Sequence, residues 1–238
     1  MYPSPRYLPF GDCGLLVEFG NTIDPETNRR VLNLDNALQE QPVEGAKEFV
    51  PTYRSLLIRY DQTRTTYEKL CSDINDLEQR IAEASNVNSN PARIVIPVVY
   101  GGEFGQDLEN VAKTHDLTAA EVVKLHSEKD YRVYMIGFVT GFPYLGEVDD
   151  RIVTPRLETP RLKVPAGSVG IAEKQTGIYP CEAPGGWRII GKTPLRLFNY
   201  RKEPPAMLKP GDTVRFKPIS GQQFNSLRES YCTETYQQ

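Results

Sequence analysis

Hydrophobic positions in the first part of the chain alternate between the spacing of a strand and that of a helix. The apolar run Leu15–Phe19 predicts a strand. Asp24-Pro25 then marks the start of a helix, because Asp is a favoured N-cap and Pro fits the first helical position. The apolar side chains that follow at helical spacing are Val31, Leu34 and Leu38.

Two further strands and a second helix follow. Short β-prone runs occupy Glu48–Val50 and Ser55–Tyr60. Thr65 with Glu68 three residues later has the pattern of a capping box, which predicts the start of the helix. The buried stripe expected on this helix contains Tyr67, Leu70, Ile74, Leu77 and Ile81. This order of elements predicts a small split-βαβ, ferredoxin-like unit.

A polar segment, Ser85–Pro91, separates this unit from the rest of the chain. Its residues are typical of turns and linkers. We therefore expect one domain over residues 1–88 and a second over residues 89–238.

The second domain begins with a predicted strand at Arg93–Tyr100. Short helices are expected near Asp107–Lys113 and after a capping box formed by Thr118 with Glu121. After Tyr131, Gly and Pro recur every few residues between short β-prone runs, which predicts a barrel or sandwich. The expected fold class is α+β.

Composition excludes several classes of function. Hydrophobic residues make up 39% of the 238 residues and charged residues 25%, as in an ordinary globular protein. The net charge of −3 gives no basic surface, so we expect no nucleic-acid partner. No apolar run approaches the ~20 residues that cross a bilayer, and residues 1–6 lack the pattern of a signal peptide, so we expect no membrane partner and a cytoplasmic location. The four cysteines are too scattered for a zinc site or a disulfide framework.

One segment matches the phosphate-loop pattern G-x-x-x-x-G-K-T. It is Gly186–Thr193, and its interior is the bulky, β-prone Trp-Arg-Ile-Ile. A phosphate loop needs backbone N–H groups that curl around the phosphates and then begin a helix. Here Pro194 follows directly and no helical pattern comes after it. We therefore interpret the match as accidental.

The histidines and one serine are weak candidates for chemistry. His115 and His126 are not spaced as a metal pair on a helix. His126 precedes the Gly/Pro-rich block and is a candidate acid/base group, although a structural histidine explains it better. Ser168 lies in the tight segment Pro165–Val169, where its hydroxyl is either exposed to a ligand or used to stabilise the turn.

Two Thr-Pro-Arg units present arginines from stiff backbone. Arg156 and Arg161 each follow a proline, and paired guanidinium groups suit a carboxylate or phosphate. Ordinary surface salt bridges are the equally weighted alternative. The aromatic residues of the block form either the wall of a cleft, a partner surface or part of the barrel core, and they are Phe138, Phe142, Tyr144, Tyr179 and Trp187.

These motifs together resemble the KipI/PxpB family, also called allophanate hydrolase subunit 1. The resemblance covers essentially the whole chain. The motifs that carry it in the Gly/Pro-rich block are Gly137–Leu145, the two Thr-Pro-Arg units, Val164–Val169, Gln175–Pro180, Pro184–Trp187 and Ile190–Pro194. Further matches are Gly11-Asp12, Val17–Gly20, Val50–Tyr53, Ser55–Leu57, Tyr100–Gly105 with Asp107-Leu108, Leu125–Ser127 and Leu208–Phe216. The resemblance implies a ferredoxin-like N-terminal domain and a cyclophilin-like β-barrel.

The resemblance also implies a function. Its members include the B subunit of 5-oxoprolinase, a complex that uses ATP to open 5-oxo-L-proline to L-glutamate. The implied partners are a KipA/PxpC-like subunit and a LamB/YcsF-like PxpA subunit. On this reading Arg156 and Arg161 bind anions, and His126 is an acid/base group. Donors lining the cleft would be Ser168, Gln175, Thr176 and Tyr179, and Pro165 would belong to the cleft or partner surface with the aromatic residues.

The chain departs from the family pattern at three positions. Two other functions are also compatible with the resemblance. The family commonly has Pro at Thr140, Gly at Glu173 and Arg at Lys192. Glu173 would add a carboxylate at the rim of the cleft. Inhibition of a sensor histidine kinase, as described for KipI, would use the same architecture. A subunit of an allophanate hydrolase or urea carboxylase would instead act on urea or allophanate.

Overall fold

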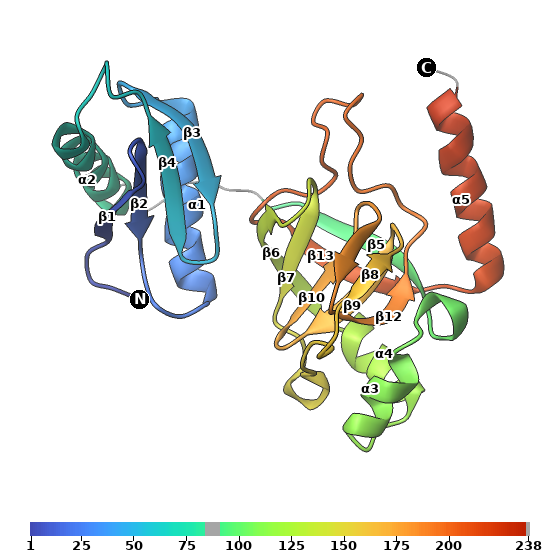
Figure 1. Ribbon diagram of the computed structural model, residues 1–238. Coiled ribbons are helices and arrows are strands. Elements are labelled where there is room, and N and C mark those ends of the chain that lie inside the picture. The colour runs from blue at the N-terminus through green and yellow to red at the C-terminus, as the bar shows by residue number, and fades with distance from the viewer. Residues whose placement is uncertain (84–90, 237–238) are drawn as a thin grey trace. The chain divides into compact units, whose positions relative to one another are not determined.

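A computed structural model describes residues 1–83 and 91–236, with side chains described as far as Glu229 (Figure 1). The chain divides into two compact units, Met1–Asn90 and Pro91–Gln238. The boundary expected between residues 88 and 89 lies outside the described residues. Each unit has its own apolar core and is described by itself.

The N-terminal unit is a four-stranded antiparallel sheet with two helices. Its elements are β1 (Arg6–Phe10), β2 (Gly14–Glu18), α1 (Pro25–Glu40), β3 (Ala46–Pro51), β4 (Ser55–Tyr60) and α2 (Tyr67–Glu83). The sheet order is β1-β2-β4-β3. Strand β1, which the sequence analysis did not predict, lies at the edge beside β2. In the predicted β-α-β-β-α-β unit, this edge position is instead occupied by a strand that follows the second helix.

Capping explains where the two helices begin. Asp24 accepts a hydrogen bond from the backbone N–H of Thr27 at 2.8 Å, as predicted for α1. The predicted cap of α2 is wrong by one residue. The Oγ1 atom of Thr66 accepts from the N–H of Lys69 at 3.2 Å, whereas the Oγ1 atom of Thr65 is buried without a hydrogen bond. The predicted apolar stripe is confirmed, because its central residues are buried against the sheet and its ends are half-buried.

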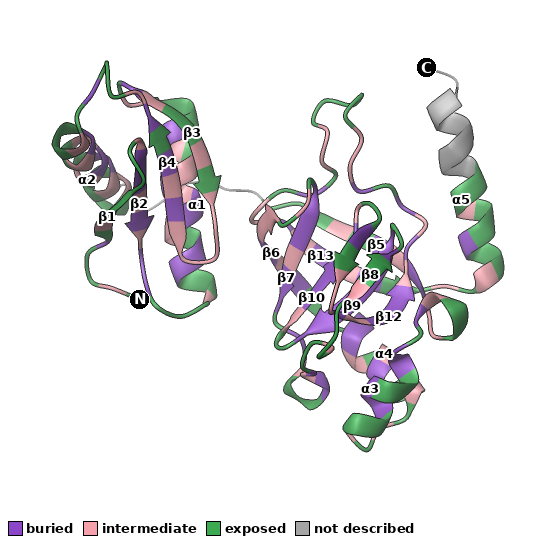
Figure 2. Ribbon diagram, in the orientation of Figure 1, coloured by how far each residue is buried: buried purple, intermediate pink, exposed green. Residues whose placement is uncertain are grey.

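The C-terminal unit contains a closed seven-stranded barrel, as expected. In barrel order the strands are β10 (Gln175–Ile178), β7 (Phe142–Gly146), β6 (Asp130–Gly137), β13 (Thr213–Pro218), β5 (Arg93–Tyr100), β12 (Arg188–Lys192) and β9 (Ser168–Ala172). Strand β13 runs parallel to β5, and the other neighbours pair antiparallel. Buried, mainly aliphatic side chains from these strands make up much of its core. Long stretches of the barrel strands are accordingly coloured as buried in Figure 2.

Short helices flank the barrel. Helices α3 (Leu108–Thr114) and α4 (Ala119–Ser127) lie together at one end (Figure 1), and the predicted capping box of Thr118 with Glu121 is present on α4. Helix α5 (Gly221–Tyr236) follows β13 and is anchored through the buried Phe224, whose ring lies 5.0 Å from that of Phe104.

A two-stranded ribbon lies outside the barrel. It pairs β8 (Arg161–Val164) with β11 (Ala183–Gly185). The ribbon contributes Val164 and Ala183 to an apolar cluster that is separate from the barrel interior. The cluster also contains Trp187 and side chains from the outer surface of neighbouring barrel strands.

The segment that matches a phosphate loop is a barrel strand. Residues Arg188–Lys192 form β12, which pairs with β5 and β9. A Cβ atom at Gly191 would lie 2.7 Å from both a methyl group of Val98 and the carbonyl oxygen of Val99. Gly191 therefore serves close packing between strands, which agrees with the interpretation of the match as accidental.

Candidate functional site

The five aromatic residues singled out in the sequence form one cluster on the outside of the barrel. Phe142 lies at its centre, with its ring centroid 4.9 Å from that of Tyr144, 5.2 Å from that of Tyr179 and 5.3 Å from that of Trp187. Phe138 extends the cluster with an edge-to-face contact to Phe142 at 5.7 Å. The interpretation as core holds for Phe142, Tyr179 and Trp187, which are buried, although their cluster is separate from the barrel interior.

The outer edge of this cluster is exposed. Phe138 lies in the turn between β6 and β7, and 58% of its surface is accessible. Its φ of 61° is a left-handed conformation that a bulky side chain seldom adopts. Such backbone strain concentrates at binding and active sites, so Phe138 is a candidate contact residue.

Arg156 provides the charge of the candidate site. Its side chain is exposed, and no hydrogen bond or ion pair to it occurs among the described residues. Its positive charge acts on two aromatic neighbours. Burial raises the pKa of Tyr144 and of Tyr179, and Arg156 offsets part of each rise. A Cβ atom placed at Gly186 would lie 3.7 Å from the Cβ atom of Arg156, so Arg156 lies beside the segment that leads into Trp187 of the aromatic cluster.

The segment before Arg156 is firmly held. Thr154 is buried, forms a β-bridge to Glu173 and makes a hydrogen bond of 3.0 Å with Nε2 of His115. Pro155 follows, and its carbonyl oxygen accepts from Nε of Arg188 at 3.3 Å. Arg156 is therefore presented from a fixed backbone, as its Thr-Pro-Arg unit predicted.

Arg161 has a different environment from Arg156. Its Nη2 donates to Oδ1 of Asp107 at 2.7 Å, and its Nη1 donates to the carbonyl oxygen of Trp187 at 3.3 Å. The pair with Asp107 is mostly buried. The guanidinium group of Arg161 is thus engaged within the protein, and Arg156 is the arginine of the two that faces solvent without an ion pair in the described part of the chain.

His126 lies inside the barrel unit rather than at the aromatic cluster. Its ring is fully buried and stacks on Phe216, with centroids 4.5 Å apart. Thr176 Oγ1 donates to the carbonyl oxygen of Gly170 at 3.0 Å, so it accepts from Nε2 of His126 at 2.8 Å. Nδ1 then accepts from the hydroxyl of Tyr100 at 2.8 Å.

This environment determines the charge of His126. Burial lowers its pKa to about 3, so the ring is neutral at ordinary pH. Both ring nitrogens are engaged with protein groups. The acid/base role expected for His126 finds no support in this geometry, and Thr176 is likewise used inside the protein.

The remaining expected site residues are dispersed. Ser168 begins β9 and is buried, Gln175 begins β10 and is half-buried, and Pro165 lies exposed in the turn before β9. Burial raises the pKa of Tyr179, and the backbone of Trp187 offsets part of the rise. Of the polar residues expected in the cleft, Tyr179 lies with the aromatic cluster and Arg156.

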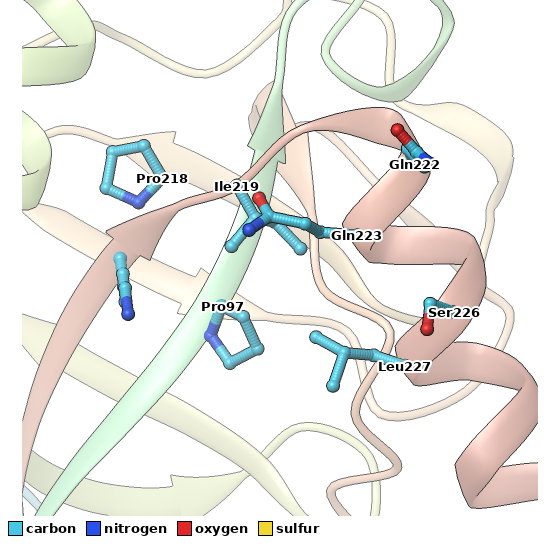
Figure 3. A pocket seen from close by; sticks show the side chains of 8 residues that line it. Pro97, Pro218, Ile219, Gln222, Gln223, Ser226 and Leu227 are labelled. Atoms are coloured by element: carbon cyan, nitrogen blue, oxygen red, sulfur yellow. The ribbon is translucent and has the colours of Figure 1, made fainter.

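A separate hollow lies beside α5 and is lined by none of the residues expected in the site. It encloses about 480 Å³ and is lined by Pro97, Ile219, Gln223 and Leu227 among others (Figure 3). Among the described residues there is no cluster of three or more His, Cys, Asp or Glu side chains able to hold a metal ion. No described helix is long and apolar enough to cross a membrane.

Asp107 is the residue of this region that the sequence analysis missed. The sequence analysis placed it at the start of a helix and in a motif of the family resemblance but gave it no role at the site, and it is the N-cap position of α3. Its carboxylate makes no cap hydrogen bond there and binds Arg161 and the N–H of Ile189 instead. An acidic residue before a short helix gives no local signal for such a role, because both partners are more than fifty residues away.

Comparison with known proteins places the chain in a family. Residues 5–208 match the family model of the carboxyltransferase domain, subdomain C and D. The chain belongs to this family. The B subunit of 5-oxoprolinase from Bacillus subtilis (strain 168) is 43% identical to this carboxyltransferase-family chain over 228 residues, which cover 92% of the chain and 95% of that protein. The B subunit of 5-oxoprolinase from Haemophilus influenzae is 52% identical over 143 residues, 60% of the chain and 67% of that protein. The expected resemblance is confirmed.

Solved structures confirm the fold. The structure of TTHA0988 superposes with a TM-score of 0.77 at 38% identity, over 87% of this carboxyltransferase-family chain. The chain spans only 40% of that solved chain. The Kluyveromyces lactis urea amidolyase superposes with a TM-score of 0.75 at 20% identity, which shows a shared fold.

Proposed function

We propose that this chain is the B subunit of a 5-oxoprolinase and that the Arg156 surface binds the substrate. The similarity to such B-type subunits extends over 92% of the chain and 95% of the Bacillus subtilis protein. A protein of this type works in a complex, and we propose a KipA/PxpC-like subunit and a LamB/YcsF-like PxpA subunit as its partners. The complex would convert 5-oxo-L-proline to L-glutamate at the expense of ATP.

The observation that carries the assignment of the site is the exposed Arg156 beside an aromatic surface. 5-Oxo-L-proline has a carboxylate attached to a small, flat lactam ring. A guanidinium group binds a carboxylate through two parallel hydrogen bonds. The rings of Phe138 and Tyr144 offer an apolar surface to the lactam next to that cation. Arg156 would therefore bind the substrate and orient its ring.

ATP supplies the activation that a lactam needs, because phosphorylation of the lactam oxygen makes its carbonyl carbon open to attack. The residues Gly186–Thr193 do not fit the phosphates of ATP, because Arg188–Lys192 form a barrel strand and no helix begins directly after them. We therefore assign binding and orientation of the substrate to this chain, and we route no step of phosphate transfer through its residues.

The test is the replacement of Arg156 by alanine in the complex as purified from its native cell. We expect the KM for 5-oxoproline to rise at least about tenfold, because a hydrogen bond to a charged group contributes on the order of 1.5–3 kcal/mol. Arg151→Ala is the matched control, since Arg151 is also exposed but pairs with Asp149. A KM for Arg156→Ala close to that of the Arg151→Ala control would refute the site. Turnover of urea or allophanate in place of 5-oxoproline would refute the proposed substrate.

A further inference from the structure

We propose that Asp107 is a positioning residue of the Arg156 site. Through Arg161 and the backbone of Ile189, it would hold the segment that presents Arg156 against β12 and Trp187, which directly precedes that strand. This inference rests on the proposed function, because the role that it gives to the Asp107–Arg161 pair is to position Arg156 for substrate binding.

The Asp107 side chain joins three parts of the C-terminal unit. It is 7% exposed and lies at the start of α3. Its Oδ2 accepts from the N–H of Ile189 at 2.6 Å, and its own N–H donates to the carbonyl oxygen of Ile189 at 2.8 Å. Its Oδ1 accepts from Arg161 at 2.7 Å. One buried carboxylate therefore ties α3 to β12 and to β8.

Arg161 transmits this restraint to the site. Arg161 is the first residue of β8 and directly follows the connection that contains Arg156. Its Nη1 donates to the carbonyl oxygen of Trp187. The same connection is also tied at Leu157, whose N–H donates to the carbonyl oxygen of Gly186 at 2.7 Å. Arg156 thus lies in a short connection whose far end depends on the Asp107–Arg161 pair.

The charges explain why loss of Asp107 would act at a distance. Removal of one partner leaves the other as an unpaired, mostly buried charge, which is strongly unfavourable. Without Asp107, Arg161 would turn toward solvent and release its hydrogen bond to Trp187. The connection that contains Arg156 would then keep its ties at Thr154 and Leu157 but lose the one at Arg161, which would shift the cation relative to the aromatic cluster.

The experiment compares Asp107→Asn with a matched control in the purified complex. Asp212→Asn serves as the control, because Asp212 is 2% exposed and accepts two backbone hydrogen bonds, from Ala92 and Lys209, far along the chain from Arg156. For Asp107→Asn we expect a rise of about tenfold in the KM for 5-oxoproline, with kcat changed less than about threefold. For Asp212→Asn we expect the KM of the wild type.

Trp187 provides a second readout that is independent of turnover. It is the sole tryptophan of the chain and is 5% exposed. In the purified chain we expect Asp107→Asn to shift its fluorescence to longer wavelength, as contact with water increases, and Asp212→Asn to leave it unchanged. Arg161→Lys is the milder variant, which keeps the charge but not the forked geometry, and it should shift both readouts in the same direction to a smaller extent.

The outcomes separate this inference from the proposed function. Wild-type KM and fluorescence in both Asp107→Asn and Arg161→Lys would overturn the positioning role, as would equal changes in Asp212→Asn. A wild-type KM in Arg156→Ala would overturn the substrate site instead. If Asp107→Asn does not fold, Arg161→Lys decides by the same two measurements.

Discussion

The buried His126 makes the barrel sensitive to acid in a way that can be calculated. The pKa of His126 falls from 6.5 to about 3 on folding, because burial disfavours the charged ring. The unfolded chain therefore binds a proton below pH 6.5 that the folded barrel does not bind. The free energy of unfolding therefore carries no penalty from His126 above pH 6.5, and it decreases as the pH falls from 6.5 toward 3.

The size of the effect follows from the two pKa values. At pH 5 the unfolded histidine is 1.5 pH units below its pKa while the folded ring remains neutral, which costs about 2 kcal/mol relative to pH 7.5. In His126→Gln this contribution disappears. We expect that variant to be less stable at pH 7.5, because the stacking on Phe216 is lost, but to lose less stability on acidification.

Urea unfolding at several pH values between 7.5 and 5 provides the measurement. Fluorescence of Trp187 reports the unfolding of the barrel unit, since the chain has no other tryptophan. The quantity of interest is the difference between wild type and variant in the pH dependence of the unfolding free energy, because this removes the contribution of the carboxylates. Parallel pH dependences in the two proteins would show that His126 is not kept neutral by burial, and the reasoning would be wrong.

Three other substitutions test the packing and the caps. Gly185→Ala should destabilise the barrel unit by about 1–3 kcal/mol in urea unfolding, because a methyl group there would collide with the hydroxyl of Tyr179. Thr66→Ala should cost about 1 kcal/mol by removing the cap of α2, measured as a lower thermal midpoint of the N-terminal unit. Thr65→Val should raise that midpoint, because the buried hydroxyl has no hydrogen bond. A larger loss of stability in Thr65→Val than in Thr66→Ala would instead support Thr65 as the cap of α2, as the sequence predicted.

The sequence predicted elements well where the pattern of one segment decides its structure. The helix after Asp24, the capping box at Thr118 and the strand Arg93–Tyr100 are all present. Strand β1 was missed because most of its side chains are exposed, so it shows no alternation between buried and polar positions. The cap of α2 shifted by one residue because a turn from Asp61 to Thr65 precedes the helix.

For the candidate site, the sequence grouped the aromatic residues but also included residues that the fold places elsewhere, and it did not separate the roles of the two arginines. The aromatic residues were grouped correctly, since Phe142 and Tyr144 lie two residues apart on the same side of one strand. Arg156 and Arg161 occupy identical Thr-Pro-Arg units, so no local pattern distinguishes them. The distinction comes from Asp107, which is 54 positions from Arg161 in the chain and beside it in space.

The position of the aromatic cluster outside the barrel has a consequence for evolution and for design. Exposed side chains of the β8–β11 ribbon and of the connection before it, such as Leu162 and Arg156, can be altered without disturbing the side chains that fill the barrel interior, because the two apolar clusters are separate. Mutations that change what the surface binds therefore need not weaken the scaffold. A surface with its own small core can diverge in sequence while the barrel beneath it stays the same.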